Sequence, residues 1–193
     1  MTRYKVNEIF RSLQGEGYHT GRAAVFVRLA GCNLRCPFCD TAHAEGCMLT
    51  ADEIAERAKR EADGVRFLVL TGGEPALQAD APLIATLKAA GFYIAIETNG
   101  TRPLPPGIDW ITLSPKADAR LCLTRADELK IVFEDEDRFL SYPNIDAAHR
   151  FVQPCDTGRA DRNRAVTAAA IDYIVRHPEW RLSLQTHKFT GIR

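Results

Sequence analysis

The alternation of short apolar segments with helical segments constrains the fold of this chain more than any other feature. Residues 24–30, 66–70 and 92–96 are apolar and partly β-branched, so each is predicted to be a buried strand. Helical segments separate the second of these strands from the first and from the third. This alternation predicts a parallel sheet with right-handed crossovers.

Capping and breaking residues place the two helices. The sequence Thr-Ala-Asp-Glu at 50–53 is a capping box, and it predicts a helix that runs to about Glu61 and ends at Gly64. Pro75 suits the first turn of a second helix, which Gly91 would close. Each helix would return the chain to the same edge of the sheet.

Further strands are predicted at residues 110–113, 129–133 and 150–152. The connections between them show little amphipathic period, and residues 101–107 contain too much proline for a helix interior. A last helix over about 163–176 precedes another apolar strand at 180–184. The expected architecture is α/β, an incomplete parallel barrel with about six core strands and about three crossover helices.

Length and charge narrow the class of protein. A chain of 193 residues can bury on the order of 70% of its unfolded surface, so residues 1–193 are predicted to form one domain. Lys plus Arg and Asp plus Glu each number 25, which argues against a nucleic-acid or membrane-surface partner and favours a small ligand. The first residues contain no apolar signal segment, so we expect a cytoplasmic protein.

Three cysteines follow the first predicted strand, at positions 32, 36 and 39. Their clustering in a chain expected in a reducing compartment favours metal binding over disulfides. A structural zinc site needs four ligands, for which Cys47 is the nearest additional candidate. A 4Fe-4S cluster held by three thiolates leaves one iron free for a small molecule. The spacing favours iron–sulfur, and a zinc-stabilised binding module stays open as the alternative.

Polar residues follow the other predicted strands. In α/β barrels, active sites lie at the carboxyl ends of the strands. Gly72 and Gly73 let the backbone approach a ligand closely, and Glu74 can accept hydrogen bonds from an ammonium group. The corresponding segments are Thr71-Gly72-Gly73-Glu74-Pro75, Glu97-Thr98-Asn99-Gly100, Ser114-Pro115-Lys116 and Gln153-Pro154-Cys155-Asp156.

The three cysteines followed by Gly-Gly-Glu-Pro after the next strand resemble the radical S-adenosylmethionine superfamily. The resemblance implies that Cys32, Cys36 and Cys39 hold a 4Fe-4S cluster, whose fourth iron is chelated by S-adenosylmethionine. Gly73 and Glu74 would receive its ammonium group, and Phe38 would lie beside the adenine. The remaining cofactor-binding candidates are Cys39, Asp40, Ser114, Pro115, Lys116, Gln153, Pro154, Cys155 and Asp156.

Both ends of the chain resemble one family of that superfamily, the 7-carboxy-7-deazaguanine synthases of the queuosine pathway, which serves tRNA modification. The resemblance is carried by Asn-Glu-Ile-Phe-Arg-Ser-Leu-Gln-Gly-Glu-Gly at 7–17, Arg28, Cys-Asp-Thr at 39–41, Ser-Pro-Lys at 114–116 and Gln-Thr-His-Lys at 185–188. It implies conversion of 6-carboxy-5,6,7,8-tetrahydropterin to 7-carboxy-7-deazaguanine with loss of ammonia. It also implies Mg²⁺ bound by the Thr41 hydroxyl, with Asp40 a second candidate.

The same resemblance implies a set of substrate-binding residues. Gln14 and Glu16 can read the donor and acceptor edge of a pterin, and Arg28 offers a planar fork for a carboxylate. The last residue, Arg193, would contact the substrate through its terminal carboxylate. The full set is Leu13, Gln14, Gly15, Glu16, Arg28, Thr71, His187 and Arg193.

Two partners are expected, an external electron donor and a second copy of the chain that covers the open edges of the barrel. Another enzyme of the superfamily, such as a glycyl-radical activase, is the nearest alternative function. A zinc-stabilised module is the alternative from a different class.

Overall fold

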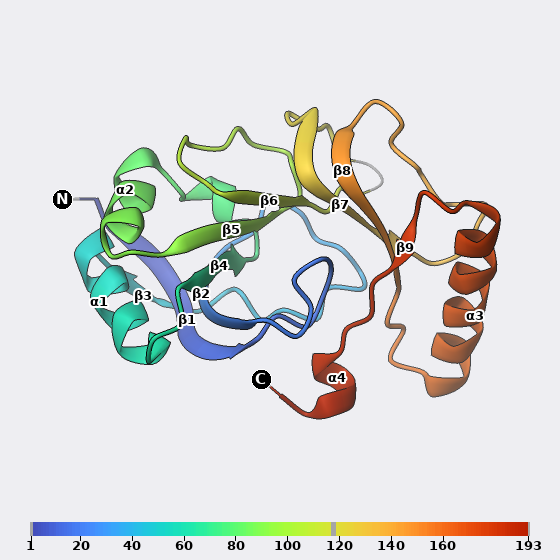
Figure 1. The fold of residues 1–193 in the computed structure, drawn as a ribbon, viewed down its shortest axis with the longest axis horizontal. Helices are drawn as coiled ribbons and strands as arrows, with labels where there is room; N and C mark the ends of the chain where they lie inside the picture. The colour runs from blue at the N-terminus through green and yellow to red at the C-terminus, as the bar shows by residue number, and fades with distance from the viewer. Residues whose placement is uncertain (1, 117–118, 193) are drawn as a thin grey trace.

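The computed structural model describes residues 2–116 and 119–192, in which one curved sheet carries its three longer helices on its outer side (Figure 1). The strands are β1 Tyr4–Leu13, β2 Ala23–Leu29, β3 Cys47–Leu49, β4 Phe67–Gly72, β5 Tyr93–Thr98, β6 Trp110–Leu113, β7 Arg125–Phe133, β8 Asp146–Pro154 and β9 Arg181–Leu182. The helices are α1 Ala51–Ala62, the short 3₁₀ helix η1 Pro75–Leu77, α2 Ala81–Ala89, α3 Ala160–Arg176 and α4 His187–Thr190. In the described part of the chain, no helix is long and apolar enough to cross a membrane.

The order of strands confirms the predicted parallel barrel core. Strands β2, β4, β5, β6, β7, β8 and β9 follow one another and pair in parallel. Strand β1 pairs with β2 in the antiparallel direction, and β3 pairs with β1 in the same way. The sheet therefore stays open, with β3 and β9 at its two edges. Because parallel strands share one direction, their carboxyl ends all reach the same rim.

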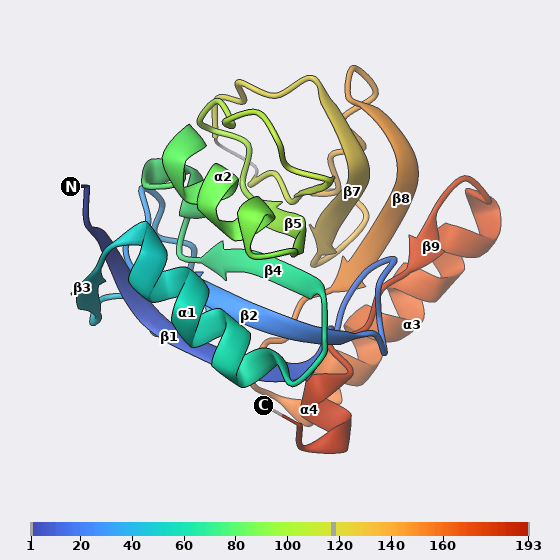
Figure 2. The same cartoon turned by 60° about the vertical axis from the view of Figure 1, so that its left-hand side comes forward.

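Two apolar layers hold the helices against the outside of the sheet. Figure 2 shows α1 and α2 side by side over the first strands, and the buried side chains of both helices join one cluster with β2, β4 and β5. A second cluster joins α3 to β6, β7 and β8. The predicted capping box fixes the start of α1, since Thr50 N donates to Glu53 Oε2 at 2.7 Å and Glu53 N donates to Thr50 Oγ1 at 3.2 Å.

The helix predicted to begin at Pro75 is divided in the structure. The chain forms η1 at Pro75, and α2 begins only after Asp80, whose Oδ1 accepts a 3.0 Å hydrogen bond from Leu83 N. Asp80 followed closely by Pro82 is an ordinary helix start, so the sequence contained this signal. The predicted helix over 163–176 is confirmed as α3, which begins slightly earlier.

Strands β1 and β3 were not predicted. Polar residues interrupt the alternation of β1, which also contains a bulge between Val6 and Glu8, and β3 has only three residues. Strands β7 and β8 are longer than expected at their amino ends. The strand predicted at 180–184 is reduced to β9, and Trp180 before it packs into the cluster beneath α3.

The connections after β5, β6 and β7 contain no helix among the described residues, as the sequence indicated. The three longer helices, α1, α2 and α3, are therefore the ones that cover the sheet.

The loop between β1 and β2 covers the amino ends of the core strands. Its Tyr18 and His19 rings pack against Trp110 at centroid distances of 4.9 and 4.5 Å, and His19 also contacts Phe67 at 4.7 Å. Trp110 and Phe67 are the first residues of β6 and β4. This aromatic packing fills the amino end of the barrel, so a ligand-binding site is expected at the carboxyl end.

Candidate active site

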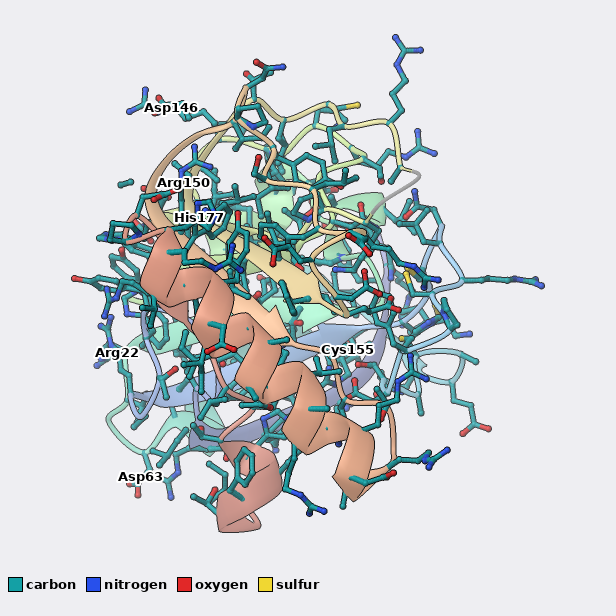
Figure 3. All side chains as sticks on the ribbon, turned by 90° about the vertical axis from the view of Figure 1, so that its right-hand side faces the viewer. Arg22, Asp63, Asp146, Arg150, Cys155 and His177 are labelled. Atoms are coloured by element: carbon teal, nitrogen blue, oxygen red, sulfur yellow. The ribbon has the colours of Figure 1, made fainter. Side chains whose placement is uncertain are left out.

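A cavity of about 790 Å³ lies at the carboxyl ends of the strands. Cys155, directly after β8, lines the cavity, and Figure 3 shows it well apart from Asp146, the first residue of β8, and from Arg22. All the described residues predicted for the site line this cavity except Glu74 and Pro115. Arg193, expected to contact the substrate, lies outside the described residues.

The loop after β2 brings Cys32, Cys36 and Cys39 to one wall of the cavity. Burial raises the pKa of the Cys36 thiol, Lys116 opposes this effect, and the neighbouring Cys39 and Cys32 add to it. The three thiols are therefore near one another, although no three Cys, His, Asp or Glu side chains of the described residues converge on a single ion position. Three thiolates that bind three separate irons of a cube need no such point, so the donor set fits a 4Fe-4S cluster.

Cys47, the fourth ligand of the zinc alternative, lies elsewhere. It belongs to β3, pairs with Val6 and lies beside the Arg57 guanidinium, at 3.8 Å from Nη1 to Sγ. It does not line the cavity that holds the other three thiols. A mononuclear zinc site needs four ligands around one ion, so this arrangement disfavours the zinc interpretation.

Gly73 allows the loop after β4 to lie directly against the cysteine loop. Gly73 N donates to Leu29 O at 3.3 Å, and Glu74 N donates to Gly31 O at 2.9 Å. A Cβ at position 73 would overlap the Gly31 carbonyl oxygen and crowd the Cys32 Cβ. The Gly-Gly segment thus supports the loop that carries the thiols.

Glu74, predicted to receive an ammonium group, finds its hydrogen-bond partners within the chain in this structure. Its side chain is fully buried, and its oxygens accept hydrogen bonds of 2.9 Å from Ala76 N, 2.7 Å from Thr98 Oγ1 and 2.7 Å from Asn99 N. Burial raises the pKa of the Glu74 carboxyl, while these hydrogen bonds and Lys116 oppose the rise. The carboxylate joins the ends of β4 and β5 instead of facing the cavity.

A buried lysine lies among carboxylates on the inner wall. Lys130 Nζ, on β7, lies 2.6 Å from Glu16 Oε2 and 3.0 Å from Glu97 Oε2. Gln14 Nε2 donates to the other oxygen of Glu97 at 3.1 Å. Glu128 is buried nearby, and its Oε1 has no hydrogen-bond partner among the described residues. Three acids therefore share the field of one ammonium group.

The carboxylates of this network have different proton affinities. Burial alone would raise the pKa of Glu16, but Lys130, Gln185 and His187 lower it to about 2. Burial raises the pKa of Glu97 to about 7, with Lys130 opposing and Glu128 and Glu16 adding to the rise. Burial would lower the pKa of Lys130, but the surrounding acids hold it well above its usual range. Burial also raises the pKa of Glu128, with Lys130 opposing the rise, so Glu97 and Glu128 are the acids of this network whose protonated forms burial favours.

Arg28 faces the cavity and pairs with a carboxylate of the neighbouring strand. Its Nε donates to Glu8 Oε1 at 2.8 Å across the β1–β2 pair, and both residues line the cavity. The cross-strand partner fixes the guanidinium at the cavity wall, where it can meet an anionic group.

The segment before and within α4 closes one side of the cavity. Gln185 Nε2 donates to Glu16 Oε1 at 3.0 Å, and Thr186 N donates to Gly15 O at 3.0 Å. Lys188 Nζ lies 2.7 Å from Asp40 Oδ2 and 2.6 Å from Asp156 Oδ2. These contacts bring residues from near both ends of the chain together.

Sequence reasoning did not assign Glu8, Glu97, Lys130, Gln185 and Lys188 to the site, although they line the cavity. Lys130 is a charged residue inside the apolar strand predicted at 129–133, and that position was a signal that could have found it. Glu97 stands at a strand end that the sequence analysis had noted.

Residues 27–125 match the model of the radical SAM superfamily. A parallel barrel with three thiols on the loop after its first parallel strand thus defines a radical SAM protein, a class whose members bind a 4Fe-4S cluster and S-adenosylmethionine.

Similarity to individual proteins extends over nearly the whole chain. It is 54% identical to 7-carboxy-7-deazaguanine synthase of Bacteroides thetaiotaomicron, over 98% of each protein. It is 46% identical to the protein of the same name from Burkholderia multivorans, over 98% of this chain and 99% of the relative. The crystal structure of QueE from Escherichia coli superposes with a TM-score of 0.74 at 30% identity, over 96% of this chain and 95% of that one. The chain belongs to the 7-carboxy-7-deazaguanine synthase family.

Proposed function

We propose that this chain converts 6-carboxy-5,6,7,8-tetrahydropterin to 7-carboxy-7-deazaguanine with loss of ammonia. One observation carries the proposal: a single cavity joins the three thiols of the cluster loop to Gln14, Glu16 and Arg28. A cofactor at the thiols and a pterin at the polar wall would therefore meet inside one cavity. The family membership supports this choice of substrate over the protein substrate of a glycyl-radical activase.

The thiolates of Cys32, Cys36 and Cys39 would hold the cluster, and Gly73 would present backbone to S-adenosylmethionine. When bound, these cofactors supply the chemistry that removes a hydrogen atom from C6 of the pterin. Phe38, Ser114 and the β8 end lie on the same cavity and would contact the nucleoside. Glu74 would act indirectly, because its carboxylate already accepts three hydrogen bonds from the chain.

The acidic wall would bind the pterin ring. Lys130 and Gln185 hold the two oxygens of Glu16, so this carboxylate keeps one orientation and stays ionised at neutral pH. An ionised carboxylate accepts hydrogen bonds from the amino and ring N–H groups of a pterin. Arg28 would pair with the substrate carboxylate, and His187 would contact the ring from the other side.

Mg²⁺ would be bound through the Thr41 hydroxyl together with substrate oxygens and water. Magnesium takes few protein ligands in sites of this kind. Asp40 is the weaker candidate, because Lys188 already pairs with its Oδ2 at 2.7 Å. Loaded in this way, the ion would neutralise the substrate carboxylate.

The chain would also use an external electron donor and form a homodimer. Strands β3 and β9 are sheet edges, and Met48 and Leu182 on them are exposed. Covering such an edge with a second copy would protect unpaired backbone groups. Light scattering of the purified protein measures this, and a monomer mass would contradict the dimer.

Anaerobic reconstitution tests the function. The protein should bind about four irons and, with a reductant, S-adenosylmethionine, Mg²⁺ and the carboxylated pterin, yield the deazaguanine product by mass spectrometry. Cys36→Ser should lose the cluster, while the matched control Cys47→Ser should retain it. Cluster formation and S-adenosylmethionine cleavage without product would reject the pterin as substrate.

A further inference from the structure

Lys188 connects the loop that carries the cluster thiols to the end of β8. Its Nζ lies 2.7 Å from Asp40 Oδ2 and 2.6 Å from Asp156 Oδ2, and about a third of its side chain is exposed. Asp156 is held in place, since its Oδ1 accepts hydrogen bonds of 2.9 Å from Gly158 N and 2.7 Å from Asn163 Nδ2. Asp40 directly follows Cys39, so one ammonium group joins a fixed carboxylate to the cysteine loop.

The residues just before Lys188 contact the opposite wall. The Thr186 amide and hydroxyl both donate to Gly15 O, at 3.0 and 2.9 Å, and Gln185 donates to Glu16 Oε1 at 3.0 Å. The His187 ring lies so close to Gly15 that a Cβ there would overlap it, with 2.6 Å to Nδ1. Residues 185–188 therefore span the cavity from the proposed pterin wall to the cluster loop.

We propose that Lys188 couples the two halves of the cavity, so that a pterin at the Gln14–Glu16 wall stabilises the cluster-loop conformation that binds S-adenosylmethionine. Lys188 is here a positioning residue, and the inference rests on the proposed function. A ligand that contacts residues 185–187 orders the segment, and the segment then holds Asp40 through Lys188. Because such coupling is reciprocal, S-adenosylmethionine strengthens pterin binding by the same factor.

Equilibrium binding to the cluster-loaded protein measures the coupling directly. In the unmodified protein, saturating pterin should tighten S-adenosylmethionine binding by about fivefold or more, within the usual range for coupled sites. In Lys188→Met this ratio should fall to about one, and Lys188→Arg should restore part of it because a guanidinium can reach both carboxylates. Lys59→Met is the matched control, since Lys59 pairs with Glu56 on the exposed face of α1.

Hydrogen exchange gives a readout that does not depend on catalysis. Pterin should slow exchange in residues 183–192 and in residues 36–42 of the unmodified protein, but only in residues 183–192 of Lys188→Met. If Lys188→Met folds poorly, Asp40→Asn provides a second test, and it should show the same loss of coupling. A coupling ratio that is one in the unmodified protein, or unchanged in both variants, overturns the inference. Failure of the unmodified protein to bind the pterin at all would instead reject the proposed function.

Discussion

The Glu74 carboxylate accepts a 2.7 Å hydrogen bond from the hydroxyl of Thr98, and this contact links the carboxyl ends of β4 and β5. The acid of the Gly-Gly-Glu segment thus serves first to hold two strand ends together. The cavity wall keeps its shape because this buried carboxylate is satisfied by groups of the chain itself.

Glu74→Gln is therefore expected to destabilise the protein even without any ligand. The glutamine amide has one NH₂ group, which must face a hydrogen-bond donor in either orientation. That donor is the Asn99 N–H in one orientation and the Ala76 N–H and Thr98 hydroxyl in the other, so a buried group loses its partner. The free energy of unfolding should fall by about 1–3 kcal/mol in urea denaturation of the cluster-free protein. An unchanged midpoint would mean that Glu74 acts only on ligands.

Lys130→Met should be among the most damaging substitutions of the inner wall. It leaves Glu16 and Glu97 buried without their shared cation, and losing one partner of a buried pair costs about 3–5 kcal/mol. Adding Glu16→Gln should recover part of the loss, because Glu16 is the carboxylate that Lys130 keeps ionised. Chemical denaturation of both variants measures the change in unfolding free energy. Lys59→Met, which breaks an exposed ion pair, is the control, and its stability is expected within about 1 kcal/mol of the unmodified protein.

The pKa of Glu97 predicts a pH dependence of stability. Burial raises this pKa from 4.5 to about 7, so the folded state binds the proton more tightly than the unfolded state. Stability is therefore lost as the pH rises from about 4.5 to 7 and is constant above that range.

The Glu97→Gln variant lacks this titration. Its unfolding free energy, measured relative to that of the unmodified protein, should therefore increase by roughly 1–3 kcal/mol from pH 5 to pH 8. Glu16 does not contribute in this window, because Lys130 and its other partners overcome the effect of burial and lower its pKa to about 2. Denaturation curves across the pH range provide the measurement. A difference between the two proteins that is the same at pH 5 and pH 8 would contradict the assignment.

Gly73→Ala should weaken cluster binding more than folding. The added Cβ overlaps the Gly31 carbonyl oxygen, and that contact moves the loop carrying Cys32. Iron content after reconstitution should drop well below that of the unmodified protein. Gly64→Ala is a suitable comparison, since an alanine there would be strained at φ +89° but its Cβ would meet no atom within 4 Å. Equal iron contents in the two variants would refute this role of Gly73.

Local features of the sequence were enough to predict the parallel core and the position of the thiols. Strand β2 and the capping box of α1 depend on residues close together in the chain, and both are confirmed. The contact between Lys130 and Glu16 joins residues 114 positions apart, so no local pattern could pair them. The burial of Glu74 likewise depends on the pairing of β5 with β4. That pairing brings Thr98 and Asn99 against the Glu74 carboxylate, and no local pattern around Glu74 could predict it.

The aromatic packing of Tyr18 and His19 across the amino ends of the strands has a kinetic consequence. Because the loop between β1 and β2 covers the amino ends of the strands, neither ligand is expected to enter the cavity from that side. Pterin and S-adenosylmethionine would then both approach from the side of the carboxyl ends. The ligand that binds deeper is then expected to bind first and to leave last, which predicts an ordered binding scheme.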